Sequence, residues 1–404
     1  MRATAPAPNS LQQLVLDLSE ELAALTAHGL LRRSATLESA DGPVVRIDGR
    51  DVVCWCSNDY LGLAGHPALA KAAADAAAEW GVGARASRLL SGSTAWHGRL
   101  ETELAGWFQA EAALVYPSGY QANLGTLGAL LSSSDAVGID RLAHASLWDA
   151  IRASRAAVRV FRHHDVDDAR QVISRAAGAR RRLLVTEGVF SMDGDTPPLA
   201  ALLEVAEAQD ALLYLDDAHG AFVLGASGRG TPEAAGVAPE RLLYIGTLGK
   251  ALGCQGGFVV GPQVLIDYLR NRARTFIYTT ALATPVAAAA VAALAVVRQE
   301  PQRRQQLSAN VRLLHDSLGP LAASAQASHI VPVIVGEAAA AVELSRRLWE
   351  RGIWAPAIRP PTVPEGAARL RLSVTAIHTS SQIAALGQAL RESLEGLSTL
   401  PRLA

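Results

Sequence analysis

Cysteine, aromatic side chains and excess charge of either sign are all scarce in this sequence. Its 404 residues include three cysteines, Cys54, Cys56 and Cys254, which form neither a CxxC pair nor a disulfide framework. The 37 basic side chains nearly balance the 38 acidic ones, so no basic excess indicates a nucleic-acid partner. Aromatic residues make up only 5% of the chain, so aliphatic side chains must fill the core. This composition predicts a cytoplasmic protein that does not bind nucleic acid.

Uninterrupted hydrophobic runs are also short. The longest apolar stretch, ALATPVAAAAVAALAVV (281–297), is dominated by alanine, contains Pro285 and is slightly short for a membrane span. The N-terminal stretch MRATAPAPNSLQQLVLDLSEEL has no continuous apolar segment and carries acidic residues early, so we do not expect a signal peptide there. The sequence therefore predicts no membrane association.

Short apolar runs alternate with helical stretches through the middle of the chain. Strands that are apolar on both faces and alternate with helices indicate a mostly parallel sheet covered on both sides, as in α/β folds. The predicted strands are 112–116, 183–187, 211–216, 241–246 and 256–261, and the predicted helices between them include 145–154 and 198–209. Ahead of the first strand, Pro67 indicates the start of a helix that runs to Trp80 and is stopped by Gly81, and another helix is predicted from Gly98 to Phe108.

The two ends of the chain follow other patterns. Leucines at helical spacing predict an amphipathic helix over 11–33, and alternation around DGRD predicts a hairpin over 43–55. Beyond residue 281, a long helical region precedes short strands and a closing helix, which is typical of a smaller α+β domain. We therefore predict three parts: an N-terminal arm of helix and hairpin (1–52), a large domain (53–284) and a small C-terminal domain (285–404).

A lysine in a glycine-rich turn follows one predicted strand. GTLGKALGCQGG (246–257) places Lys250 just after the apolar run LLYI. The turn fails the phosphate-loop pattern, because Tyr244 stands where that pattern needs glycine and Ala251 where it needs serine or threonine. GVGARA (81–86) fails as a dinucleotide fingerprint, because it follows a predicted helix instead of a strand. A Schiff-base lysine and a solvated turn remain open.

A second polar cluster follows the strand ALLYLD. Asp216 and Asp217 end that strand and His219 comes next, at the carboxyl edge where open α/β sheets bind ligands. Acids in this position also cap the next element, and aspartate and histidine are metal ligands. No HxH or HExxH pair is present to support a metal, so we predict no metal site.

Both places together satisfy the needs of pyridoxal 5'-phosphate. This cofactor requires a lysine for an imine, a carboxylate at the pyridine nitrogen, donors for the phosphate and a flat side chain over the ring. Lys250 and Asp216 suit the first two roles. SGYQAN (118–123) offers a hydroxyl and amides at a helix start, and Thr247 lies three residues before the lysine. His144, at a strand–helix junction, can stack on the ring.

The motifs and their order resemble the α-oxoamine synthases, which are pyridoxal-phosphate enzymes of the aspartate-aminotransferase fold (fold type I). The resemblance covers about residues 15 to 395. It implies a PLP-dependent acyltransferase with a large, mostly parallel sheet domain, a smaller α+β C-terminal domain, and a homodimer with a shared active site. The segments that carry it are SNDYLGL (57–63), SGYQAN (118–123), EGVFSMDGD (187–195), DDAHG (216–220), TLGK (247–250) and RLRLSVTAIHT (369–379).

The resemblance implies catalytic roles for four matching residues and a cofactor-binding role for a fifth, Ser191. Lys250 would hold the cofactor and then move the α-proton of the substrate. Asp216 would pair with the pyridine nitrogen, and His219 would bond the ring oxygen. His144 would stack on the ring, with Ser191 near the cofactor's edge.

The resemblance also implies which residues bind the phosphate and the substrate. Arg371 would hold the carboxylate of the amino acid, with Asn58 near it, whereas Arg369 would be structural. Thr279 and Thr280 would add hydroxyls to the site of a partner subunit. The residues that would hold the phosphate within one subunit are Ser118, Gly119, Tyr120 and Thr247.

The segment AIRPPTVPEGAARLRLS (357–373) narrows the resemblance further. It is similar to the member of the family that joins L-alanine to pimeloyl-CoA or pimeloyl-ACP in biotin synthesis. Two departures concern substrate preference: Ala283 and Thr284 replace two usual prolines, and GVGARAS replaces a glycine- and serine-rich loop near the acyl substrate. Alternatives are a sister synthase that uses glycine, serine or another acyl thioester, another pyridoxal-phosphate class, and a non-enzymatic descendant.

Overall fold

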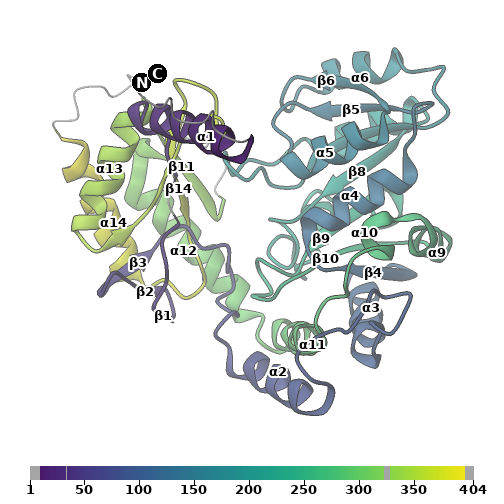
Figure 1. Ribbon diagram of the computed structural model, residues 1–404, viewed down its shortest axis with the longest axis horizontal. Helices are drawn as coiled ribbons and strands as arrows, with labels where there is room; N and C mark the ends of the chain where they lie inside the picture. The colour runs from purple at the N-terminus through teal and green to yellow at the C-terminus, as the bar shows by residue number, and fades with distance from the viewer. Residues whose placement is uncertain (1–9, 33, 323–327, 396–404) are drawn as a thin grey trace, which may run out of the picture.

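The computed structural model describes residues 10–32, 34–322 and 328–395 and is built around one seven-stranded sheet (Figure 1). The strand order is β4-β10-β9-β8-β7-β5-β6. Neighbours from β9 to β6 are parallel, while β10 runs antiparallel to both β4 and β9. The mostly parallel sheet is thus confirmed. Its strands are β4 (Ala112–Tyr116), β5 (Ala136–Asp140), β6 (Ala157–Phe161), β7 (Arg182–Glu187), β8 (Leu212–Asp216), β9 (Leu243–Thr247) and β10 (Gly257–Gly261).

Both faces of this sheet are covered by helices. One hydrophobic cluster joins one face to α3, α6, α7 and α11, and a second joins the other face to α4, α5, α9 and α10. Two-sided burial explains why the strands read as continuous apolar runs. The helix bounds are α3 (Ala95–Trp107), α4 (Gly119–Leu130), α5 (Ala145–Ser154), α6 (Val166–Ser174), α7 (Leu199–Ala208), α9 (Gln263–Arg272), α10 (Arg274–Ile277) and α11 (Thr284–Gln299).

The C-terminal part carries a three-stranded sheet, β11-β14-β13, beside three helices (Figure 1). This arrangement is the smaller α+β unit that the sequence predicts. Its antiparallel pairing places Arg371 opposite Pro332 in the middle of β14. The elements are α12 (Gln302–Leu318), β11 (Ile330–Gly336), α13 (Ala338–Glu350), β13 (Ala357–Ile358), β14 (Ala368–Ser373) and α14 (Ser380–Leu394).

The N-terminal segment joins this C-terminal part. Strands β1 (Ser39–Asp41), β2 (Val44–Ile47) and β3 (Arg50–Cys54) form a meander, and β3 pairs in parallel with β12 (Ile353–Trp354). The division at residue 52 therefore falls inside a strand, and the three-domain division stays a prediction. Helix α1 (Ser10–Ala27) has no buried residue. Helix α2 (Pro67–Trp80) begins at its proline and ends at Trp80, with Gly81 as its C-cap, as predicted.

Several element bounds differ from the predicted ones for local reasons. Helix α3 begins at Ala95, not Gly98, because Thr94 and His97 form a capping box. The predicted helical region 285–325 is two helices divided at Pro301, and its last three residues lie outside the described ones. Strands β5 and β6 were not predicted, although β5 is entirely buried. No helix within the described residues is long and apolar enough to cross a membrane.

Asp217 fixes the loop that leaves β8. Its carboxylate accepts hydrogen bonds from the Thr231 backbone N–H (2.8 Å), the Thr231 hydroxyl (2.6 Å) and the Tyr244 hydroxyl (2.8 Å). Burial raises the pKa of Asp217 to about 7, although these donors oppose the shift. The residue is fully buried, so the bonds are shielded from water. Asp217 thereby closes the loop that carries His219.

We expect Asp217→Ala to lower the free energy of unfolding by about 3 kcal/mol, because it leaves buried donors without partners. Chemical denaturation followed by circular dichroism measures this change. Asp267→Ala is the matched control, since Asp267 pairs with Arg270 at the surface and should cost less than about 1 kcal/mol. Equal losses in the two variants would contradict the anchoring role.

Candidate active site

Lys250 and His219 meet at the carboxyl edge of the large sheet. Lys250 follows β9, His219 follows β8, and the lysine Nζ lies 2.7 Å from Nε2 of the histidine. The other ring nitrogen of His219 lies 2.6 Å from the Tyr60 hydroxyl. Burial lowers the pKa of His219 well below its usual value, and the charges of Lys250 and Arg371 lower it further. His219 is therefore a neutral imidazole between a lysine and a tyrosine.

Lys250 is itself tuned by its surroundings. Burial lowers its pKa to about 8, against the attraction of the Asp216 carboxylate. Near neutral pH a usable fraction of this side chain is the free amine, which is the nucleophilic and basic form. Burial, together with the Asp216 charge, raises the pKa of Glu187 well above its usual value, so that side chain is protonated.

Asp216 ends β8 as a buried carboxylate with a fixed orientation. One oxygen accepts a hydrogen bond from the Asn123 side chain (2.6 Å), and the other accepts from the Ala218 backbone N–H (3.0 Å). The Tyr214 hydroxyl donates to the Asn123 amide oxygen (2.8 Å), which turns the Asn123 nitrogen towards Asp216. Asp216 thus has the position and charge needed to hold a proton on a pyridine nitrogen.

His144 belongs to the same network through Ser146. It caps the N-terminus of α5, and its Nδ1 lies 2.8 Å from the Ser146 hydroxyl oxygen, which also accepts from Asn123 (2.9 Å). Burial lowers the pKa of His144, and the Asp216 charge opposes this shift. The imidazole is therefore a held, flat group beside Asp216, as a residue that stacks on a cofactor ring must be.

A cradle for an anion lies at the start of α4. Ser118 caps this helix and Gly119 begins it, so unpaired backbone N–H groups point outward there. A Cβ at Gly257 would lie 2.5 Å from the Gly119 Cα, and one at Gly119 would lie 3.4 Å from Thr247. Thr247 receives the Gly249 N–H on its hydroxyl (3.1 Å). The missing side chains of Gly119 and Gly257 leave this helix end uncovered, and its N–H groups are donors that fit a phosphate.

Arg371 is a buried guanidinium without a negative partner. It is 7% exposed, and its Nη2 donates to the Asn58 amide oxygen (3.1 Å) and the Tyr60 hydroxyl (3.3 Å). Nη1 donates to the Ser373 hydroxyl (3.0 Å), and Nε donates to the Ser191 carbonyl. Every hydrogen-bond partner of Arg371 within the described residues is uncharged. A buried unpaired cation is costly, so this site is suited to a carboxylate ligand.

The structure brings most of the predicted site residues together, and the positions of Ser191, Tyr120, Thr279 and Thr280 differ from those of the rest. Ser191 meets Arg371 through its backbone carbonyl. Tyr120 is 42% exposed and donates to Asp149, with its ring 6.4 Å from that of His144. Thr280 is exposed and pairs with Ser87, and no hydrogen bond described in the structure links it or Thr279 to this subunit's site. Arg369, in contrast, bonds Asp193 and the Met192 carbonyl, which agrees with a structural role.

Three functional side chains were not singled out from the sequence. Tyr60 links His219 to Arg371, Asn123 holds Asp216, and Glu187 is buried beside Asp216. All three stand inside the quoted motifs SNDYLGL, SGYQAN and EGVFSMDGD, so the signal was present as motif membership. The roles of Tyr60 and Asn123 depend on contacts across 159 and 93 residues, which local spacing does not encode.

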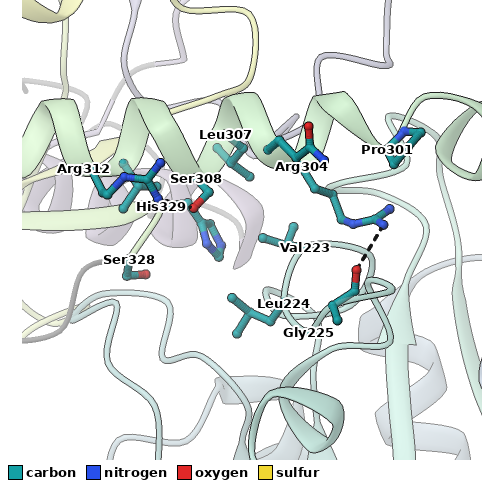
Figure 2. Close-up of a pocket in the computed structure, with 13 residues that line it drawn as sticks. Val223, Leu224, Gly225, Pro301, Arg304, Leu307, Ser308, Arg312, Ser328 and His329 are labelled. Atoms are coloured by element: carbon teal, nitrogen blue, oxygen red, sulfur yellow. Dashed lines mark hydrogen bonds between the residues drawn. The ribbon is translucent and has the colours of Figure 1, made fainter.

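A cavity of about 530 Å³ lies behind the Tyr60 side of the site, between α12 and residues 223–226 (Figure 2). His329 points into it, and its ring centroid is 4.2 Å from that of Tyr60. Burial lowers the pKa of His329 to about 3, so its imidazole is neutral. Arg304 reaches across the cavity to the Ala226 carbonyl (3.5 Å). The Tyr60 side of the active site is thus backed by a second buried imidazole.

We expect Gly257→Ala to weaken the binding of pyridoxal phosphate by about tenfold or more, because the new methyl group must displace the start of α4. Absorbance titration of the cofactor-free protein measures the dissociation constant. Gly98→Ala is the control, since a Cβ there meets nothing within 4 Å. Unchanged affinity in Gly257→Ala would place the phosphate elsewhere.

Known proteins match this chain over nearly its whole length. The family described as aminotransferase class I and II matches residues 50–390. An 8-amino-7-oxononanoate synthase of Aromatoleum aromaticum is 46% identical over 380 residues, which cover 93% of this chain and 98% of the relative. One from Chromobacterium violaceum is 48% identical over 371 residues, which cover 92% and 96%.

Solved structures of the same enzyme family share this fold. Sphingomonas wittichii serine palmitoyltransferase superposes with a TM-score of 0.90 at 30% identity, covering 98% of this chain and 100% of that chain. An 8-amino-7-oxononanoate synthase from Francisella tularensis gives a TM-score of 0.73 at 28% identity, covering 84% and 97%. The chain therefore belongs to the class I and II aminotransferase family of pyridoxal-phosphate enzymes, and within it to the α-oxoamine synthases together with the 8-amino-7-oxononanoate synthases.

Proposed function

We propose that this enzyme condenses L-alanine with a pimeloyl thioester, with loss of carbon dioxide, to give 8-amino-7-oxononanoate for biotin synthesis. The relatives that share 44–48% identity carry the name of this activity. The observation that carries the proposal is the position of Arg371, a guanidinium with no acidic partner among the described residues, on the same side of the site as Lys250. Tyr60 contacts both Arg371 and His219, and His219 contacts Lys250. An amino acid bound here would have its carboxylate at Arg371 and its α-carbon towards Lys250.

Pyridoxal phosphate, when bound, supplies an electron sink for the α-carbon of the amino acid. Ser118, Gly119 and Thr247 would hold its phosphate, and Asp216 would keep a proton on its ring nitrogen. The pKa of about 8 lets Lys250 act near neutral pH as the base that takes the α-proton and as the acid that returns one. His219 is neutral and can hydrogen-bond the ring oxygen without adding charge.

The net reaction balances with the uptake of one proton, because the α-carbon loses one proton and regains one while the departing thiolate takes up another. The α-carbon of alanine bonds to the acyl carbon, the thiol leaves, and the alanine carboxylate departs as carbon dioxide. Arg371 would hold that carboxylate during binding, with Asn58 fixing the guanidinium in place. Because both are buried or half-buried, the carboxylate is shielded from water while it is held.

We also propose a homodimer in which Thr279 and Thr280 complete the site of the partner. Thr280 is exposed and Tyr278 is 71% exposed, so this segment is available to another subunit. Helix α1 supports assembly too, because its leucines form an exposed apolar stripe. These leucines, each 41–67% exposed, are Leu11, Leu14, Leu18, Leu22 and Leu25.

The cytoplasm is the location we propose, without a membrane or nucleic-acid partner. The support is compositional: the net charge is −1, and Cys54, Cys56 and Cys254 are all free thiols.

A sister synthase that uses glycine or serine is the second candidate. The TM-score of 0.90 with serine palmitoyltransferase favours it, whereas the higher sequence identity to the oxononanoate synthases favours alanine.

The product can be identified by mass spectrometry. Purified enzyme with pyridoxal phosphate, a pimeloyl thioester and a mixture of L-alanine, glycine and L-serine should give only the alanine product less carbon dioxide. Lys250→Ala should lower turnover by about a thousandfold or more, because it removes both the nucleophile and the base. Consumption of another amino acid would assign the chain to a sister synthase, and normal turnover in Lys250→Ala would refute the role of the lysine.

Mixed dimers test the shared site. Lys250→Ala and the double variant Thr279→Ala/Thr280→Ala should each be weakly active, since each damages both sites of its own dimer. After the two are mixed and allowed to exchange subunits, each hybrid dimer has one intact site, so activity should rise by about tenfold over either parent. No recovery, with hybrids verified by native mass spectrometry, would argue that these threonines act within their own subunit.

A further inference from the structure

The turn formed by residues 190–195 holds one side of the Arg371 site. Its ends are joined by hydrogen bonds from the Gly194 N–H to the Phe190 carbonyl (2.8 Å) and from the Phe190 N–H to the Asp195 carbonyl (3.0 Å). Ser191 presents its carbonyl to Arg371 from this turn. The position of the guanidinium therefore depends on what fixes the turn to the rest of the protein.

His163 fixes the turn from behind. Its Nε2 lies 3.0 Å from a carboxylate oxygen of Asp195, and its Nδ1 lies 2.9 and 3.1 Å from the two oxygens of Asp140. Asp140 is fully buried at the end of β5, where it also accepts from the backbone N–H groups of Leu142 (2.9 Å) and His164 (3.2 Å). Ionised carboxylates only accept hydrogen bonds, so both nitrogens of His163 carry protons and the ring is a cation.

The groups around His163 favour this charge. Burial alone would lower the pKa of His163, but the hydrogen bonds to Asp140 and Asp195 outweigh it and raise the pKa to about 9. His164 stacks on His163 at 3.7 Å and has a lowered pKa, because of burial and the charge of His163. The edge of Phe190 covers the ring at 4.4 Å. One charged and one neutral imidazole thus lie beside two carboxylates.

We propose that His163 is a positioning residue for the amino-acid site: its imidazolium ties the 190–195 turn to the end of β5 and so holds the Ser191 carbonyl against Arg371. The chain of contacts runs from Asp140 through His163 to Asp195, along the turn to Ser191, and on to Arg371. His163 does not touch the reacting atoms. The inference rests on the proposed function only in taking Arg371 as the group that binds the amino-acid carboxylate.

The contact between His163 and the turn should weaken as pH rises. A histidine whose pKa is raised on folding stabilises its contacts fully below about pH 6.5, and this stabilisation is lost as pH rises through about 9. The tie between β5 and the turn is therefore complete at pH 7 and broken at pH 10. Asp193 acts on the same turn through its ion pair with Arg369, and this second tie does not involve His163.

The test compares His163→Gln with wild type in the enzyme loaded with pyridoxal phosphate. At pH 7 we expect the KM for the amino acid to rise about tenfold while kcat changes by less than about threefold, because binding geometry is lost and the reacting groups stay. The ratio of the two KM values should fall towards one at pH 10, where wild type has also lost the tie. Taking a ratio cancels the titration of the amino acid itself.

His164→Gln is the matched control, because Nδ1 of His164 lies 3.8 Å from Oδ2 of Asp195, which is beyond hydrogen-bond distance. It should leave KM and kcat within about twofold of wild type. An unchanged KM in His163→Gln, a ratio that is equal at pH 7 and pH 10, or a loss confined to kcat would overturn the proposal. If no amino acid is turned over by wild type, the proposed function fails first, and cofactor absorbance with bound L-alanine still reports the affinity change.

Two further measurements keep the proposal testable if the variant is unstable. Histidine-labelled wild-type protein should show one imidazole that stays protonated on both nitrogens at pH 8, and its absence would refute the cation. His163, His164 and Asp195 also bring ligand atoms within 4.8 Å of one another, as metal ligands do. Stoichiometric metal in the purified enzyme, with activity lost to a chelator, would show that His163 is a ligand and overturn the proposal.

Discussion

The carboxylate of Asp216 is the interaction on which the rest of the site depends. A buried charge is costly unless its oxygens are satisfied, and here Asn123 and the Ala218 N–H satisfy them. Asn123 comes from α4, the helix whose first turn forms the anion cradle. One hydrogen bond therefore links the carboxylate at the end of β8 to the helix that follows β4, where we propose that the phosphate binds.

The same charge influences the neighbouring acids and bases. It supports a protonated Glu187, and it offsets part of the burial that lowers the pKa values of Lys250 and His144. Without Asp216, burial and nearby cations would push the pKa of Lys250 lower still. The pKa of Lys250 is therefore about 8 because the Asp216 charge offsets part of the effect of burial.

Much of the fold was predictable from sequence, for a physical reason. Buried parallel strands must be apolar on both faces, and polar residues directly after them mark the functional edge. Lys250, Asp216 and Ser118 were singled out in this way, and the structure places all three after strands of the large sheet. Edge strand β6 was not, because its valines are exposed and its sequence AVRVF lacks the buried pattern. Helix α3 was placed three residues late because a capping box involves side chains that do not look apolar.

The rest of the site was not predictable, because it depends on contacts between distant segments. Tyr60 reaches His219 across 159 residues, and Arg371 reaches Asn58 across 313. The N-terminal meander pairs with β12, and residues 57–60, which follow it, contact His219 after β8 and Arg371 on β14. The pairing of β3 with β12 therefore also shapes the site. It places the neutral side chains that orient an unpaired guanidinium next to the lysine, and a carboxylate ligand is the group that would complete that arrangement.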